Sequence, residues 1–214
     1  MITFARWFTA MNLRPDSGRL AKSAAIVTLG LLTFASGCTK VQQQGTGSSY
    51  LIVDQIQAAS GATPSQFGGF LQSDVLTKGS IFEDPGEVTL SLGLKDPGSS
   101  DSPTSPTTAN FITITRYHVD YVRADGRNTQ GVDVPYSFDG GVSVTVGGQS
   151  STAAFVLVRG QSKLEAPLAA LSSNGQIIST VAQVTFYGTD QTGRAVSVTA
   201  SIGINFADWA DPSS

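Results

Sequence analysis

The stretch from Ala195 to Phe206 reads AVSVTASIGINF. Apolar residues occupy every second position: Val196, Val198, Ala200, Ile202, Ile204 and Phe206. Small or polar residues fill the positions between them. Because successive side chains of a strand point to opposite faces, this pattern predicts a β-strand with one dry face and one wet face.

The same period of two recurs along the chain before this stretch. Further strands are predicted where apolar residues alternate or run continuously: 87–94, 111–123, 142–146, 151–158 and 178–186. The run at 151–158 is the most continuous, as expected of a strand that is buried on both faces. These strands and the turn residues between them predict a single domain over residues 50–209.

Strands with one dry and one wet face suit antiparallel sheets that pack face to face. We therefore expect an all-β fold, a single antiparallel β-sandwich of about seven to nine strands. Its serial strands resemble immunoglobulin-like and fibronectin type III-like sandwiches, although the Cys…Trp…Cys signature does not occur. A jelly roll and a small antiparallel barrel are the alternatives.

Turn-forming residues separate the predicted strands. Asp84-Pro85-Gly86 and Asp96-Pro97-Gly98 are expected to form turns on either side of strand 87–94. Residues 96–110 are rich in Pro, Ser and Thr, so we expect an exposed and mobile loop. Residues 159–176 are expected to contain one or two helical turns.

A different pattern occupies the first 38 residues. Arg19 and Lys22 precede an apolar stretch at 24–34, which is well short of the roughly 20 residues that cross a bilayer. Three small residues then precede Cys38, the only cysteine. This order resembles the signal peptide and lipobox of bacterial lipoproteins, whether translation starts at Met1 or at Met11. The resemblance implies that Cys38 becomes the first residue of the mature protein and carries the lipid.

The resemblance also sets an expected organisation of the chain. It comprises a signal peptide with lipobox (1–37), a lipid-anchored flexible tether (38–49), the sandwich (50–209) and a C-terminal tail (210–214). The protein is then expected in the bacterial cell envelope, with the membrane as its partner through lipid on Cys38. Thr39, rather than an aspartate, follows Cys38, and the sorting rule of some lipoproteins then implies the outer membrane.

The composition excludes some classes of partner. Without residues 1–37 the chain has 177 residues, with nine basic and fifteen acidic side chains. An acidic domain with scattered Lys and Arg has no electrostatic footprint for nucleic acid. Charged residues are only 14% of the chain, below the roughly 25% of typical globular domains.

His118, the only histidine, lies in the predicted strand 111–123. Strict alternation places it on one face with Ile112, Ile114, Arg116 and Asp120. His118 and Asp120 could form an acid–base pair, but residues two apart on a strand share a face whether or not they react. We therefore interpret them as part of a polar face and predict no catalytic residues.

Asp125, Asp133 and Asp139 are the acidic residues that we considered as candidate metal ligands. Their spacing lacks the closely set carboxylates of calcium-binding loops, and Asp is common in turns. The sequence therefore predicts neither a metal site nor a cofactor.

Aromatic residues near turns are the remaining candidates for ligand contact. Tyr136, Phe138 and Trp209 could stack on a sugar, but we favour the interpretation that they plug the rim of a sandwich core. We expect a non-catalytic structural or protein-interaction role with an envelope protein as partner. A carbohydrate-binding module with a glycan partner is the alternative, and an anchored hydrolase is the least favoured function.

Overall fold

The computed structural model describes residues 47–209. The predicted signal peptide, Cys38, most of the predicted tether and the tail 210–214 lie outside the described residues. Within 47–209 no helix has the length and apolar character needed to cross a membrane. The first strand, β1 (Ser49–Ala58), begins one residue before the predicted start of the sandwich.

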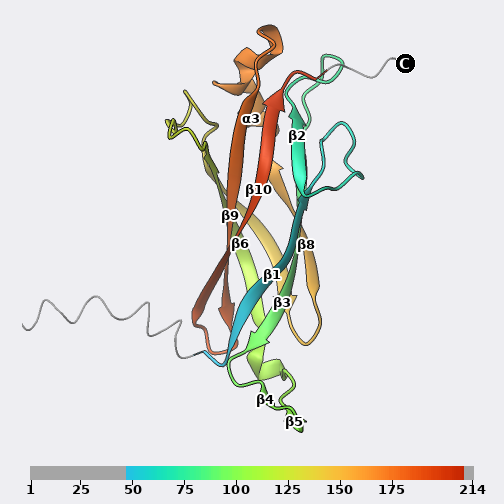
Figure 1. Cartoon of the computed structure of the whole chain (residues 1–214), viewed down its shortest axis with the longest axis vertical. Coiled ribbons are helices and arrows are strands. Elements are labelled where there is room, and N and C mark those ends of the chain that lie inside the picture. The colour runs from blue at the N-terminus through green and yellow to red at the C-terminus, as the bar shows by residue number, and fades with distance from the viewer. Residues whose placement is uncertain (1–46, 210–214) are drawn as a thin grey trace, which may run out of the picture. The chain divides into compact units, whose positions relative to one another are not determined.

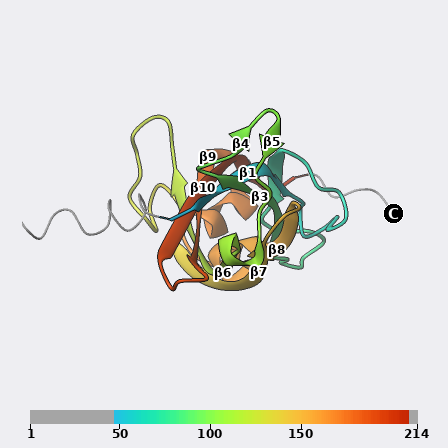
Figure 2. The same cartoon turned by 90° about the horizontal axis from the view of Figure 1, so that it is seen from below.

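Two sheets face each other in the described body (Figure 1). The three-stranded sheet has the order β1-β3-β8, with β3 at Asp84–Leu94 and β8 at Ser151–Val158. The five-stranded sheet has the order β2-β10-β9-β6-β7. Its members are β2 (Phe70–Asp74), β6 (Ile112–Val122), β7 (Phe138–Val146), β9 (Ile178–Asp190) and β10 (Ala195–Ala207). Figure 2 looks along the strands and shows them arranged around the interior.

This pairing confirms the predicted all-β sandwich, with eight strands in its two sheets. The strand order is immunoglobulin-like. β1, β3 and β8 take the places of strands A, B and E, and β6, β9 and β10 take the places of C, F and G. One pairing departs from the antiparallel prediction: β2 runs parallel to β10, with Phe70 opposite Gly203 and Asp74 opposite Ala207.

Short helical segments lie between strands. Residues between β8 and β9 form α3 (Gly160–Leu164) and the 3-10 helix η2 (Leu168–Ser173), which confirms the helical turns predicted there. The loop 96–110 contains a ribbon of β4 (Gly98–Ser99) with β5 (Ser102–Pro103) and the 3-10 helix η1 (Thr108–Asn110). Most of its residues are exposed, as expected.

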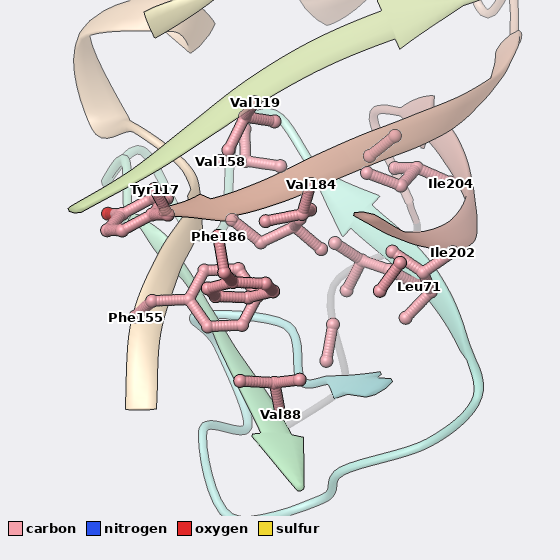
Figure 3. Packing of buried hydrophobic residues seen from close by; sticks show 14 of the residues in the cluster. Leu71, Val88, Tyr117, Val119, Phe155, Val158, Val184, Phe186, Ile202 and Ile204 are labelled. Atoms are coloured by element: carbon pink, nitrogen blue, oxygen red, sulfur yellow. The ribbon is translucent and has the colours of Figure 1, made fainter. Parts of the chain in front are cut away.

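The core lies between the two sheets and contains a group of aromatic rings (Figure 3). The ring centroids of Tyr117 and Phe155 are 5.2 Å apart, and those of Phe155 and Phe186 are 5.3 Å apart. Both pairs meet edge to face, the arrangement that aromatic quadrupoles prefer. These three rings come from β6, β8 and β9, so they join the two sheets.

Two tyrosine hydroxyls of β6 reach across the core to β8. The Tyr121 hydroxyl donates to the carbonyl oxygen of Leu157 at 2.8 Å, and the Tyr117 hydroxyl accepts from the Val156 N–H at 3.1 Å. β8 pairs only with β3 in the described sheets, so the backbone groups on the side away from β3 have no neighbouring strand to bond. The tyrosines satisfy two of these groups.

A β-bulge corrects the predicted faces of β6. The ladders to β7 and β9 both shift register between Ile114 and Arg116, which leaves Thr115 without an opposite residue. The extra residue brings Ile114 and Tyr117 to the same face, and both are buried. Strict alternation was therefore wrong for Ile112 and Ile114, because a bulge reverses the phase of every residue that follows it.

The predicted turn at Asp84-Pro85-Gly86 is also wrong. These residues form the start of β3, and they pair with β8 across an irregularity in register between Asp84 and Pro85. The Asp84 side chain is fully buried and bonded to groups from other elements. Long-range polar contacts therefore overrode the local turn preference of Asp-Pro-Gly.

Candidate functional site

The loops gather at the two ends of the sandwich. β1 begins at one end, beside the β9–β10 hairpin, and α3 and β2 lie at the other end (Figure 1). We call this second end, which carries the β6–β7 loop and the α3–η2 segment, the distal end. Functional residues are disproportionately found on loops that a rigid scaffold positions, so the distal loops are the first place to look for a site.

An open groove of about 680 Å³ lies between the β6–β7 loop and residues 166–178, which include η2. We call it the distal groove. It is lined by Arg123, Arg127, Gly131, Val132, Asp133, Ala166, Pro167, Ala170, Leu171, Asn174, Gln176, Ile177 and Ile178. Two of its apolar side chains lie largely in solvent, Val132 at 68% and Ile177 at 54% exposure. Large apolar side chains exposed on both walls of one groove are a feature of interaction sites.

Ion pairs shape the first wall. The Asp125 carboxylate accepts from the guanidinium groups of Arg123 at 2.7 Å and Arg127 at 2.9 Å. These hydrogen bonds, Arg123 first and Arg127 second, hold the pKa of Asp125 well below its ordinary value. Asp133 accepts from the Thr129 N–H at 3.3 Å further along the loop. Because Asp125 already pairs with both arginines, the polar rim of the groove is largely charge-compensated.

A buried ion pair holds α3, which precedes the second wall in the chain, to the sandwich. The Lys163 ammonium of α3 lies 2.9 Å from the Asp84 carboxylate of β3, and their side chains are 1% and 0% exposed. Lys163 also donates to the carbonyl oxygen of Asp74 at 2.8 Å. Asp84 accepts from the Ser73 hydroxyl at 2.6 Å and from the Gly61 N–H at 2.8 Å. Burial raises the pKa of Asp84, and the neighbouring Lys163 opposes that rise.

The three aromatic candidates lie in different environments. Tyr136 is 48% exposed, and its ring packs over Gly131, a residue of the groove wall. Phe138 belongs to the core, at 7% exposure, where Arg159 lies 4.4 Å over its ring, so it fits the core interpretation and offers no stacking platform. Trp209 is half-buried and donates its indole N–H to the Ser73 carbonyl oxygen. Tyr136 alone of the three combines an exposed ring with a place beside the groove.

His118 lies on the outer face of the five-stranded sheet, in a surface network. Its Nε2 lies 3.2 Å from Asp120 and its Nδ1 lies 3.3 Å from Asp139. Arg116 also binds Asp139, at 2.9 Å, and stacks 4.2 Å over the ring of Tyr187. A neutral imidazole has one N–H, so only the protonated ring can donate to both carboxylates. The network joins β6, β7 and β9 on the outer face of the sheet.

The acidic residues considered for a metal site are separated. Asp125 and Asp133 lie on the β6–β7 loop, while Asp139 lies on β7 beside Arg116 and His118. Within residues 47–209 no group of three or more His, Cys, Asp or Glu is arranged to hold a metal ion. Lipid attachment at Cys38 stays a prediction, because that residue lies outside the described range.

Sequence reasoning missed the Asp84–Lys163 pair and the distal groove. Asp84 and Lys163 are 79 positions apart, and neither shows its partner by spacing. The one local signal was a lysine next to the apolar helical residues of segment 159–176. Val132 and Ile177 likewise lie on loops that no periodic pattern connects.

Comparison with known proteins gives no match: no protein-family model fits the chain, and no curated protein or solved structure is significantly similar to it. The chemistry of the described surface is therefore what bears on function.

Proposed function

We propose that the protein is a lipid-anchored module of the bacterial cell envelope that binds another protein through the distal groove. The observation that carries the proposal is the pair of exposed apolar side chains, Val132 and Ile177, on the two walls of one groove. The predicted signal peptide that precedes Cys38 supports the location in the cell envelope. The role is one of binding, without catalysis.

The position of the groove suits a protein held at its N-terminal side. The described chain enters the sandwich at Ser49, and the groove lies at the opposite end (Figure 1). A lipid on Cys38 would then hold the end of the sandwich that lies away from the groove. The groove would face outward from the anchor, where a partner can reach it.

The lining of the groove favours a protein over a sugar. Sugar sites commonly use aromatic rings as stacking platforms, and none of the described lining residues is aromatic. Apolar residues with a polar rim instead fit a protein segment that inserts a large apolar side chain. Tyr136 is the observation that keeps a carbohydrate-binding module as the second candidate, because its exposed ring lies beside the groove.

Site-specific crosslinking in intact cells tests the proposal. A photoreactive residue at Ile177 should capture one protein neighbour, and Val132→Asp should reduce the yield at least several-fold because it places a charge in the apolar contact. The matched control is a photoreactive residue at Ile52, which is 39% exposed on β1, in the other sheet. Equal capture from both positions would contradict the proposal. Glycan binding that is lost in Tyr136→Ala would favour the carbohydrate alternative instead.

A further inference from the structure

The buried side chains of Asp84 and Lys163 carry the two groups that an amide bond needs, a carboxyl group and an amine. Lys163 Nζ lies 2.9 Å from Asp84 Oδ1, and neither side chain is more than 1% exposed. In water a carboxylate and an ammonium rarely condense, because both are strongly hydrated and they meet only by diffusion. Well-oriented groups that are held in contact can reach effective molarities of about 10⁵–10⁸ M. The fold therefore removes much of the entropic barrier to their reaction.

Burial of the pair favours both the reactive forms and the product. Burial raises the pKa of the Asp84 carboxyl, which favours the neutral acid. A proton that moves from the ammonium to the carboxylate leaves a neutral amine, which is the nucleophilic form of lysine. Two ions in a protein interior also carry a desolvation penalty that a neutral amide does not carry. Condensation therefore removes two buried charges and releases one water molecule.

The hydrogen-bond partners of the pair fit an amide. The Gly61 N–H donates to Asp84 Oδ1 at 2.8 Å, so it would donate to the amide oxygen. The Asp74 carbonyl oxygen accepts from Lys163 Nζ at 2.8 Å, so it would accept from the amide N–H. The ammonium has three N–H groups, but only two acceptors bind it among the described residues. An amide at this place would have its N–H and its oxygen satisfied, as buried amide groups require.

We propose that Asp84 and Lys163 condense to form an intramolecular isopeptide bond. The bond would join β3 to α3 across 79 positions of the chain. Cys38 is the only cysteine, so a disulfide cannot supply a covalent link inside the sandwich. A cross-link that closes a long loop stabilises a fold mainly by restricting the unfolded chain. This role does not depend on partner binding at the distal groove.

The reaction needs no reagent besides the two side chains. One proton moves from the Lys163 ammonium to Asp84 Oδ2, which gives a neutral amine and a carboxylic acid. The lone pair of Nζ then forms a bond to Cγ of Asp84, and the bond between Cγ and Oδ2 breaks. Oδ2 leaves as water with its own hydrogen and one hydrogen from Nζ, while Oδ1 becomes the amide oxygen.

Two neighbouring groups are placed to assist this step. Negative charge develops on Oδ1 as Nζ attacks, and the Gly61 N–H already donates to that atom. The Ser73 hydroxyl donates to Oδ2 at 2.6 Å, and Ser73 is 0% exposed. It can therefore pass a proton to the leaving oxygen in a place that water does not reach.

Peptide mapping of the full-length protein tests the proposal. Trypsin cleaves after lysine and arginine, but an amide on Lys163 blocks cleavage there. We expect one branched peptide that contains residues 79–95 and 160–194 and is lighter than the two segments together by one water molecule. Fragment ions from both segments in one spectrum locate the bond. Lys163→Arg keeps the positive charge but has no amine to react, so the branched peptide should be absent from that variant.

The wild-type protein alone can overturn the proposal, so the test does not depend on the folding of a variant. An unlinked chain gives residues 79–95 and 164–194 as separate peptides, because trypsin then cleaves after Lys163. Recovery of these separate peptides in place of the branched one would show that Asp84 and Lys163 remain an ion pair.

A matched pair of variants tests the role of Ser73. Ser73→Ala and Thr180→Val each remove one buried hydroxyl, but the Thr180 hydroxyl has no hydrogen-bond partner among the described residues. We expect Ser73→Ala to leave a fraction of unlinked chain that the wild type lacks, and Thr180→Val to be linked as fully as the wild type. Equal linking in the two variants would overturn the role of Ser73 in the reaction.

Discussion

At the scale of single residues, Lys163 and Asp84 form the least ordinary contact in the structure. Two ions have been moved into the protein interior, where the loss of hydration offsets much of their attraction. Both ions have further hydrogen-bond partners. Ser73 and Gly61 donate to the Asp84 carboxylate, and the Asp74 carbonyl oxygen accepts from the Lys163 ammonium. Its effect is to fix α3, the helix that precedes the second wall of the distal groove, at one place on the sandwich.

Removing one partner should be far more damaging than breaking a surface pair. Lys163→Met leaves the Asp84 carboxylate buried without its counter-ion, so we expect the free energy of unfolding to fall by about 3–5 kcal/mol. Arg116→Met is the control, because it breaks the exposed pair with Asp139 and should change the same quantity by only about 0–1 kcal/mol. Urea denaturation measures both. Equal losses in the two variants would show that the Asp84–Lys163 pair contributes no more than a surface contact.

The proposed membrane location of the protein depends on lipid attachment at Cys38. Cys38→Ser removes the thiol that would receive lipid, so we expect the protein to move from the membrane fraction to the soluble fraction or to accumulate unprocessed. Immunoblotting of fractionated cells measures this. Val41→Ser is a control that leaves the leader and the cysteine intact. Unchanged fractionation of Cys38→Ser would argue against lipid anchoring.

At the scale of elements, β10 lies between β2 and β9 and contributes buried side chains to the core. Ile202 is 2% exposed and faces the core, whereas Ser201 beside it is exposed. Ile202→Asp should therefore unfold the domain, a loss of more than about 4 kcal/mol, because it buries a charge without a partner. Ser201→Asp should leave thermal unfolding nearly unchanged. Circular dichroism during heating checks both variants, and comparable stability would mean that the two faces of β10 are assigned wrongly.

The sequence predicted elements well where one periodic pattern persisted. β10 and β9 were recognisable because their alternation is unbroken, and the helical turns between β8 and β9 were also predicted. Strict alternation predicted the faces of β6 wrongly, because its bulge at Thr115 inserts an extra residue that the local sequence pattern does not indicate. β2 was not predicted, because its five residues are too few to show an alternating pattern of apolar and polar side chains. β8 was expected to be buried on both faces, but its outer face is exposed at Thr152 and Ala154.

At the scale of the whole molecule, the fold class was predictable and the candidate site was not. Each strand with alternating apolar residues has one apolar face to bury. Several such strands in one chain therefore predict two sheets that pack their apolar faces together. The groove depends on two loops that meet at one end of the sandwich, and the strand order sets that meeting, while the Asp84–Lys163 pair fixes the neighbouring helix α3. Neither can be obtained from spacing in a single sequence, because both join residues far apart in the chain.

The described body should be independent of the residues that precede it. Its core residues all lie between Leu51 and Ala207, and residues 43–214 form one compact unit by themselves. A fragment of residues 47–209 should therefore fold cooperatively, with a Tm within about 3 °C of the mature chain released from the membrane, since about 1 kcal/mol produces a shift of this size in such a domain. Differential scanning calorimetry makes the comparison. A fragment that fails to fold, or melts far lower, would show that residues outside 47–209 contribute to the stability of the sandwich.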